Sequence, residues 1–114
     1  MSTQTVGNYL KAHRRKRGLS QRELGLLVGY MNEAPVRRHE SSKTTPPLLT
    51  ALAYEFIFET PVSAIFAGFQ SAVAHAVHTN VEEFKRDLER RAAGRPLSAQ
   101  ALQKLQWLTE RAAR

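Results

Sequence analysis

The sequence contains no cysteine among its 114 residues. Disulfide bridges and thiolate metal sites are therefore excluded, and the absence fits a reducing compartment. No apolar run approaches the roughly 20 residues that a membrane-spanning helix requires. The polar start, residues 1–5, lacks the charged-then-apolar order of a signal peptide. We therefore expect a soluble, cytoplasmic protein without a membrane partner.

Sequence signatures of catalysis and of metal binding are also missing. The chain has no nucleophile–base motif and no glycine loop that would cradle a phosphate. His75 and His78 lie three residues apart on an expected helix, but no obvious third ligand accompanies them. We therefore expect no enzymatic activity, no metal and no cofactor.

Acidic residues are scarce in the first part of the chain. Residues 1–43 hold nine Lys and Arg against three acidic residues, whereas residues 44–114 hold eight against seven. The formal net charge of +7 therefore comes mainly from the N-terminal part. Such an asymmetry favours a polyanionic partner.

Hydrophobic spacing and turn residues divide the chain into helices, and no segment alternates convincingly with period two. We therefore predict an all-α protein. A first helix ends at Gly18, and Ser20 with Glu23 three residues later forms a capping box that starts a second helix. Gly29 is typical of the left-handed residue that follows the end of a helix.

Three further helices are expected in this first region. Asn32 is the cap candidate for the third helix and places Pro35 at its third position, where a missing N–H does no harm. Pro46-Pro47 opens a fourth helix, and Thr60-Pro61 combines a cap with a proline at the first position of a fifth. The fourth helix carries the apolar residues Leu48, Leu49, Leu52, Ala53 and Phe56.

One apolar stripe continues from the fifth helix at steps of three and four residues. It consists of Val62, Ile65, Phe66, Phe69, Val73, Val77, Val81, Phe84 and Leu88. Asn80 is also a typical helix start, so one long helix and two shorter helices both stay open. Gly94-Arg95-Pro96 breaks the stripe, and Ser98 caps a last amphipathic helix. We expect one domain over residues 1–68 and a C-terminal helical region over residues 69–114.

The N-terminal pattern matches a known family. Residues 19–30 read LSQxxLxxxVGY, and the next helix ends in RRHES at residues 37–41. With Pro46-Pro47 and the segment 60–66, this pattern resembles the phage repressor/Cro-type, or XRE-type, helix-turn-helix family over about residues 5–68. The resemblance implies a five-helix repressor-like domain, double-stranded operator DNA as partner, and transcription regulation, most simply repression.

The third helix is the expected reading element, because a major groove accepts an α-helix and shows a distinct pattern for each base pair. Val36 and His39 face inward in this interpretation, which leaves polar side chains outward. We predict that base edges are approached by Glu33, Ala34 and Arg37. Arg37 suits guanine O6 and N7, and Glu33 suits the amino group of cytosine.

Phosphate contacts are expected around this helix. The candidates are Ser20, Gln21, Arg22, Asn32, Arg38, Ser42 and Lys43. The role of Gln21 is implied by the resemblance, in which that position contacts the backbone and orients the reading helix. A solvated charge is the competing interpretation at Arg38 and Lys43. The remaining basic cluster consists of Lys11, Arg15, Lys16 and Arg17, expected as solvated surface or as distant phosphate contacts.

Arg14 and Glu40 match family positions that pair between the first and third helices, so the resemblance implies a structural ion pair here. The chain also departs from the family pattern. Compared with the shortest form of the family, one extra residue lies between Gly29 and Glu40. Gly25 replaces the usual alanine, and Pro35 is unusual in a reading helix. A glycine at position 25 costs helix stability but lets helices approach closely.

The C-terminal region is expected to dimerise, because regulators of this type usually bind palindromes as dimers. The residues expected at the homodimer interface are Phe69, Val73, Val77, Phe84, Leu88, Leu102, Leu105, Trp107 and Leu108. Three alternatives stay open. The stripe folds back on its own chain, the C-terminal helices capture a toxin as in an antitoxin, or the domain is a protein-interaction module that does not read bases.

Overall fold

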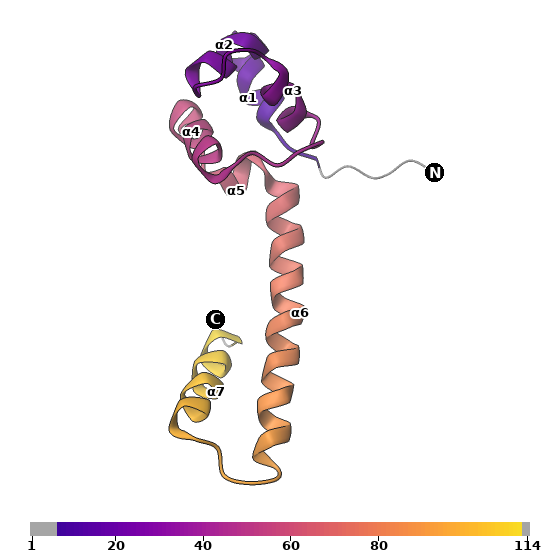
Figure 1. Cartoon of the computed structure of the whole chain (residues 1–114), viewed down its shortest axis with the longest axis vertical. Helices are drawn as coiled ribbons and strands as arrows, with labels where there is room; N and C mark the ends of the chain where they lie inside the picture. Colours follow the sequence, from indigo (N-terminus) through magenta and orange to yellow (C-terminus); the bar gives the residue numbers. More distant parts are fainter. Residues whose placement is uncertain (1–6, 113–114) are drawn as a thin grey trace, which may run out of the picture. The chain divides into compact units, whose positions relative to one another are not determined.

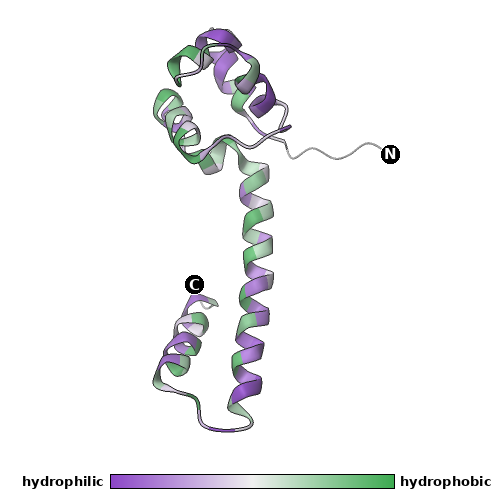
Figure 2. Ribbon diagram, in the orientation of Figure 1, coloured by the Kyte–Doolittle hydropathy of each residue, from purple (hydrophilic) through white to green (hydrophobic). Residues whose placement is uncertain are grey.

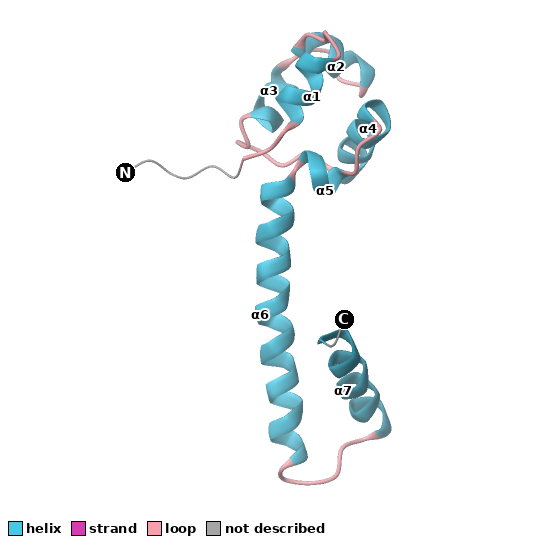
Figure 3. Cartoon of the chain, turned by 180° about the vertical axis from the view of Figure 1, so that it is seen from behind, coloured by secondary structure: helices cyan, strands magenta, loops and turns pink. Residues whose placement is uncertain are grey.

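The computed structural model describes residues 7–112, and within that range all regular structure is helical, with no strand. The all-α prediction is confirmed. The helices are α1 (Leu10–Lys16), α2 (Gln21–Leu27), α3 (Ala34–Glu40), α4 (Leu48–Phe58), α5 (Val62–Ile65), α6 (Ala67–Ala92) and α7 (Ala99–Ala112) (Figures 1 and 3). None of these described helices has the length and apolar composition to cross a membrane.

The chain forms two compact units, of which the first ends at Ala72 and the second begins at Val73. The division falls within α6, four residues after the boundary expected at residue 68. Asn80 lies inside this helix, so a helix start near Asn80 is wrong. The break in the apolar stripe instead falls at Phe66, where φ and ψ of −113° and 51° end α5.

The core of the first unit takes apolar side chains from each of its first five helices. Its buried members are Leu10, Leu24, Val36, Tyr54, Phe58, Ile65 and Phe66. Helix α3 packs against α1 and α2, and α4 packs against α5. The N–H of Tyr9 donates to the carbonyl of Ile65 over 2.7 Å, which closes α1 onto α5. Figure 2 shows that α1 and α3 are mostly hydrophilic and that α4 is mostly hydrophobic.

Helix α4 buries a different face from the one that its leucines define. Ala51, Tyr54 and Phe58 are buried. Four of the apolar residues expected on this helix are exposed: Leu48, Leu49, Leu52 and Phe56. The reason is that the large side chains of Tyr54 and Phe58 fill the core. The Phe58 ring contacts the ring of His13 on α1, and the Tyr54 ring contacts the rings of His39 on α3 and of Phe66.

The second unit contains the rest of α6, a turn and α7. Ser98 caps α7, because its Oγ accepts a hydrogen bond from the N–H of Ala101 over 3.2 Å. Leu88 on α6 and Leu108 on α7 are both buried within the single chain. These two leucines are therefore core residues of one chain, and their assignment to a dimer interface is corrected.

Candidate nucleic-acid interface

Helix α2 begins as the sequence predicts. The Ser20 Oγ accepts from the N–H of Glu23 over 3.0 Å, and the Glu23 Oε1 accepts from the N–H of Ser20 over 2.8 Å. The capping box is therefore confirmed. The hydrogen bonds from the Ser20 backbone and hydroxyl lower the pKa of Glu23.

A tight turn ends α2 and directs the chain toward α3. Gly29 has a φ of 98°, a left-handed conformation that confirms its predicted role. The N–H of Tyr30 donates to the carbonyl of Gly25 over 2.8 Å, and the N–H of Gly29 donates to Leu26 over 3.2 Å. This pair of bonds is a Schellman motif. The Tyr30 hydroxyl lies 3.1 Å from the Thr50 hydroxyl, which ties the turn to α4.

Gly25 permits the close approach of this turn to α2. A Cβ at this position would lie 2.8 Å from the carbonyl oxygen of Asn32 and 3.7 Å from a methyl of Val36. A backbone oxygen has no freedom to move aside. The sequence suggested that Gly25 lets helices approach closely, and the close neighbour in the structure is the backbone of Asn32, two residues before α3.

Helix α3 starts one residue later than expected. Glu33 is the cap residue and Ala34 the first helical residue, so Pro35 stands at the second position instead of the third. The Asn32 side chain still holds the start of the helix, because its Oδ1 accepts from the N–H of Ala34 over 2.9 Å. An Asx turn followed by proline therefore starts this short helix.

A buried ion pair fixes α3 on α1. Arg14 Nε donates to Glu40 Oε2 over 2.5 Å, and Arg14 Nη2 donates to Glu40 Oε1 over 3.2 Å. Both side chains are nearly buried. Arg14 Nη1 also donates to the Leu19 carbonyl over 2.8 Å. The predicted pair is present as a bidentate contact, the strong form of this interaction.

Gln21 completes the same network. Its Nε2 donates to Glu40 Oε1 over 3.0 Å, so the side chain joins the first turn of α2 to the end of α3. This position was predicted to contact a phosphate and to orient the reading helix. The hydrogen bond to Glu40 joins α2 to α3, and the phosphate contact stays a prediction.

Sequence reasoning missed Asn8, which joins α1 to the end of α3. Its Nδ2 donates to the His39 carbonyl and to the Ser42 Oγ, each over 2.9 Å. Its Oδ1 accepts from the N–H of Leu10 over 3.0 Å. Of these hydrogen bonds, only the local one to the N–H of Leu10 has a sequence signal, since an asparagine two residues before an apolar helical position is a common cap. The predicted phosphate ligand Ser42 is thus held at a φ of 59°.

His39 and Tyr54 form a buried polar contact between α3 and α4. The His39 Nδ1 lies 2.8 Å from the Tyr54 hydroxyl, with the rings edge to face. Burial, together with the neighbouring charge of Arg38, lowers the pKa of His39. Burial also raises the pKa of Tyr54. Both groups are therefore held neutral, and α3 is fastened to α4 without a buried charge.

The outer face of α3 carries the predicted reading residues. Arg37 and Glu33 are exposed and form an ion pair of 3.3 Å, one helical turn apart. Ala34 is half-buried. Arg37 therefore projects outward, and its Nη2 already has an anionic partner in Glu33.

A small hollow of about 190 Å³ lies beside Arg37, between α1, α2 and α3. Its lining consists of Lys11, Gln21, Arg37, Glu40 and Ser41. Two cations and an amide thus meet over the buried pair. Lys11 was expected as solvated surface or as a distant phosphate contact. Its position three residues before Arg14 on the same helix is the signal that places it on this side.

The remaining predicted phosphate ligands surround this face without converging on one point. The Ser20 side chain is engaged as the α2 cap, and the Asn32 side chain accepts from the N–H of Ala34 at the start of α3. The other three, which make no side-chain hydrogen bond or ion pair within the described residues, are exposed: Arg22, Arg38 and Lys43. The N–H of Lys43 donates to the Arg38 carbonyl over 3.0 Å, which fixes the loop after α3.

The predicted dimer residues divide by exposure. Phe69 packs against the core of the first unit, and Leu105 is half-buried. The exposed members of the set are Val73, Val77, Phe84, Leu102 and Trp107. These five side chains are each between 40% and 59% exposed, so part of each stays available for a partner.

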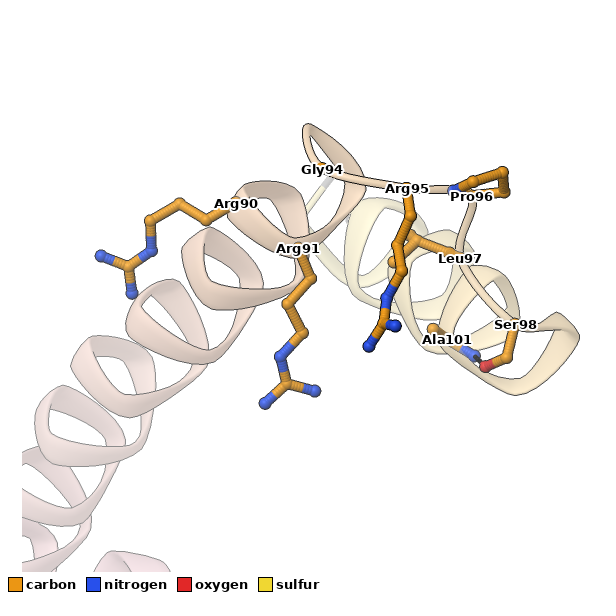
Figure 4. A pocket seen from close by; sticks show the side chains of 8 residues that line it. All are labelled: Arg90, Arg91, Gly94, Arg95, Pro96, Leu97, Ser98 and Ala101. Atoms are coloured by element: carbon orange, nitrogen blue, oxygen red, sulfur yellow. Dashed lines mark hydrogen bonds between the residues drawn. The ribbon is translucent and has the colours of Figure 1, made fainter.

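The turn between α6 and α7 forms a second basic feature, which the sequence did not single out. A hollow of about 630 Å³ is lined there by Arg90, Arg91, residues 94–98 and Ala101 (Figure 4). Figure 4 shows that Arg91 and Arg95 project to the same side, whereas Arg90 projects away. Asp87 pairs with Arg91 over 2.8 Å and with Arg90 over 3.6 Å. Asp87 therefore offsets much of this positive charge.

Metal ligands do not gather in the part of the chain that the structure describes, since no group of three or more His, Cys, Asp or Glu side chains lies together there. The basic face of α3 is exposed at Arg37 and Arg38, and the Arg14–Glu40 pair holds the same helix on α1. Comparisons with protein-family models, with curated proteins and with solved structures find no match for this chain.

Proposed function

We propose that the chain is a sequence-specific DNA-binding transcriptional regulator of the phage repressor/Cro, or XRE, type, acting as a repressor. Helices α1–α5 are its five-helix repressor-like domain, and α2, its Schellman turn and α3 are the helix-turn-helix. Helix α3 enters the major groove of a palindromic operator, which two copies of the chain bind together.

The observation that carries this proposal is an outward cationic face on a helix that two contacts hold in place. Arg37 and Arg38 project from α3. The Arg14–Glu40 pair and the His39–Tyr54 contact fix the opposite side of the same helix. A rigid element is what base readout requires, because a loosely held side chain does not distinguish hydrogen-bond patterns.

The chemistry of recognition follows from the same residues. Arg37 exchanges its exposed pair with Glu33 for the O6 and N7 acceptors of guanine, which suit a bidentate donor. Lys11 and Gln21 at the small hollow suit a backbone phosphate, since each presents a donor there. Glu33 is then free to accept from the amino group of a neighbouring cytosine.

A second candidate function differs only in the partner of the second unit. The exposed side chains of Val73, Val77, Phe84, Leu102 and Trp107 suit a homodimer, and they equally suit a toxin held by an antitoxin. We favour the homodimer, because a two-fold operator requires two reading helices. A monomeric mass in light scattering at tens of micromolar, roughly the range of weak dimers, would instead favour the toxin.

The test is selection of bound duplexes from a random DNA pool with the full chain. The proposal predicts an inverted repeat with half-sites about 34 Å apart or a multiple of that distance. Enrichment of single half-sites would retain base reading and remove the dimer. No enriched sequence at all would contradict the proposal and would leave only non-specific attraction to phosphate.

A further inference from the structure

Four large apolar side chains on α4 face solvent. Leu48, Leu49, Leu52 and Phe56 are 73%, 80%, 39% and 82% exposed. Their spacing of three and four residues puts them on one side of the helix, which we call the α4 face. Single exposed apolar residues are ordinary, but a contiguous set on one helix marks an interaction surface.

We propose that the α4 face is covered by the α4 face of a second copy of this chain, with the two helices antiparallel about a two-fold axis at Leu52. Leu48 and Phe56 lie four residues before and four residues after Leu52. A two-fold axis at Leu52 therefore brings Leu48 of one copy against Phe56 of the other, twice. A self-complementary patch of this kind is what an isologous contact requires.

The two ends of α4 also complement each other. Its first turn has no acidic residue and no side-chain cap, so its N–H groups are left to solvent. Its other end adjoins a hollow of about 310 Å³ lined by Glu55, Phe56, Glu59, Thr60 and Pro61. Glu55 and Glu59 are the only charged residues between positions 44 and 66. Antiparallel packing brings the positive end of each helix dipole to the acidic end of the other helix.

Glu59 is the carboxylate that remains for this contact. Glu55 Oε1 already accepts from the N–H of Val62 over 2.9 Å and so holds the start of α5. Glu59 is exposed beside Phe56 in the left-handed conformation that ends α4. The leucines at the start of the other copy's α4 meet the hollow, and their N–H groups meet Glu59.

The size of the α4 face limits the strength of the contact. The 11-residue helix is about 16 Å long. Its four side chains present far less than the roughly 800 Å² per partner of a standard stable interface. The contact therefore adds to an association made elsewhere in the chain, where it acts at high effective concentration. It needs no nucleic acid and is independent of base reading.

The absence of cysteine allows a direct test by disulfide trapping. Leu52→Cys in the full chain places one thiol at the two-fold axis, where helices packed at about 8–10 Å bring facing Cα atoms within disulfide reach. The control is Leu26→Cys on α2, because Leu26 is more exposed, at 55%. We expect Leu52→Cys to form the covalent dimer at least about ten times faster than the control, about the ratio that 1.4 kcal/mol represents.

A second variant separates a specific contact from random collision. Phe56→Glu in the Leu52→Cys background should slow trapping about tenfold or more, because it puts like charges beside Glu59. Leu27→Glu on α2 is the matched control and should leave the rate unchanged. Phe56→Ser replaces Phe56→Glu if the circular dichroism of the latter shows a loss of helix.

Two results would overturn the contact: equal trapping of Leu52→Cys and Leu26→Cys, or trapping that Phe56→Glu and Phe56→Ser leave unchanged. Either result would mean that a second copy of the chain does not cover the α4 face. Duplex binding by the unsubstituted chain is measured separately. A failure of this contact is therefore distinguishable from a failure of the proposed function.

Discussion

At the scale of single residues, Gly25 is where one added methyl group has the clearest effect. Gly25→Ala places a Cβ against the carbonyl of Asn32, so the turn before α3 has to shift. We expect the free energy of unfolding to fall by about 1–3 kcal/mol, the usual cost of overpacking, despite the better helix propensity of alanine. Urea denaturation measures the change.

The control for this substitution is Gly94→Ala, because the added Cβ there meets only the Arg91 carbonyl at an ordinary 3.8 Å. It should change the unfolding free energy by no more than about 0.5 kcal/mol. Equal stability of the Gly25→Ala variant and the unsubstituted chain would mean that α2 and the turn do not approach as closely as described.

The Arg14–Glu40 pair gives a second residue-scale prediction. Glu40→Ala leaves the nearly buried Arg14 guanidinium without its carboxylate, which should cost about 3–5 kcal/mol of unfolding free energy. Glu33→Ala breaks the exposed pair with Arg37 and should cost less than about 1 kcal/mol. Thermal melts that move equally for the two variants would show that Glu40 has no special role.

What the sequence predicts at this scale depends on distance along the chain. The Ser20–Glu23 capping box is a local pattern and was predicted from the residues alone. The Arg14–Glu40 pair spans 26 residues and was predicted only because the whole pattern resembles a family. Asn8 reaches α3 across 31 residues and was missed, because no local propensity encodes such a contact.

At the scale of elements, the His39–Tyr54 contact between α3 and α4 should make the stability of the chain depend on pH. The pKa of His39 is lowered from its ordinary 6.5 in the folded chain, so the unfolded chain binds a proton first as the pH falls. Neutral His39 makes its full contribution to the free energy of unfolding above about pH 6.5, the pKa of the unfolded chain. This contribution is lost as the pH falls from there through the lower pKa of the folded chain. Urea midpoints should therefore be lower at about pH 5.5 than at about pH 7.5.

His39→Asn is the variant that assigns this effect. It retains a polar group near Tyr54 and removes the titration, so the difference between the two pH values should shrink. Protonation of His39 also acts beside Arg38, a like charge that reinforces the loss. An unchanged pH dependence in His39→Asn would place the titrating group elsewhere.

The start of α2 was predicted at its capping box, whereas α3 and α5 each start one residue later than predicted and Asn80 marks no helix start. The buried face of α4 was not predicted. Nine of the 11 residues of α4 are apolar, so hydrophobic periodicity has almost no contrast with which to choose a face. The aromatic side chains of Tyr54 and Phe58 decide the choice by filling the core. The same absence of contrast hid the break at Phe66, because apolar spacing runs through it without interruption.

At the scale of the whole molecule, adjacent residues on α7 should separate folding from association. Trp107 is 52% exposed and Leu108 is 2% exposed. Trp107→Ser should weaken the homodimer about tenfold or more without altering the fold, because exposed aromatic side chains are typical interface anchors. Analytical ultracentrifugation measures the dissociation constant.

Leu108→Ala is the counterpart and should lower the unfolding free energy by about 2–5 kcal/mol, the range for emptying a buried leucine site. An unchanged mass distribution in Trp107→Ser at all concentrations would mean that α7 takes no part in self-association. The sequence predicted the amphipathic stripe but not which of its members one chain already covers, because burial of Leu88 and Leu108 depends on tertiary packing.

The excess of positive charge in residues 1–43 was visible in the sequence. It supports the central claim, which is that α3 reads DNA bases. The most direct test is the affinity of the unsubstituted chain, Arg37→Ala and Arg90→Ala for the selected duplex across a range of salt. We predict that Arg37→Ala loses about 1–3 kcal/mol and discriminates less at one position in each half-site. Arg90→Ala removes the same charge from the second unit and should leave discrimination unchanged. Equal losses at every position for both variants would show attraction to phosphate alone and would contradict base reading by α3.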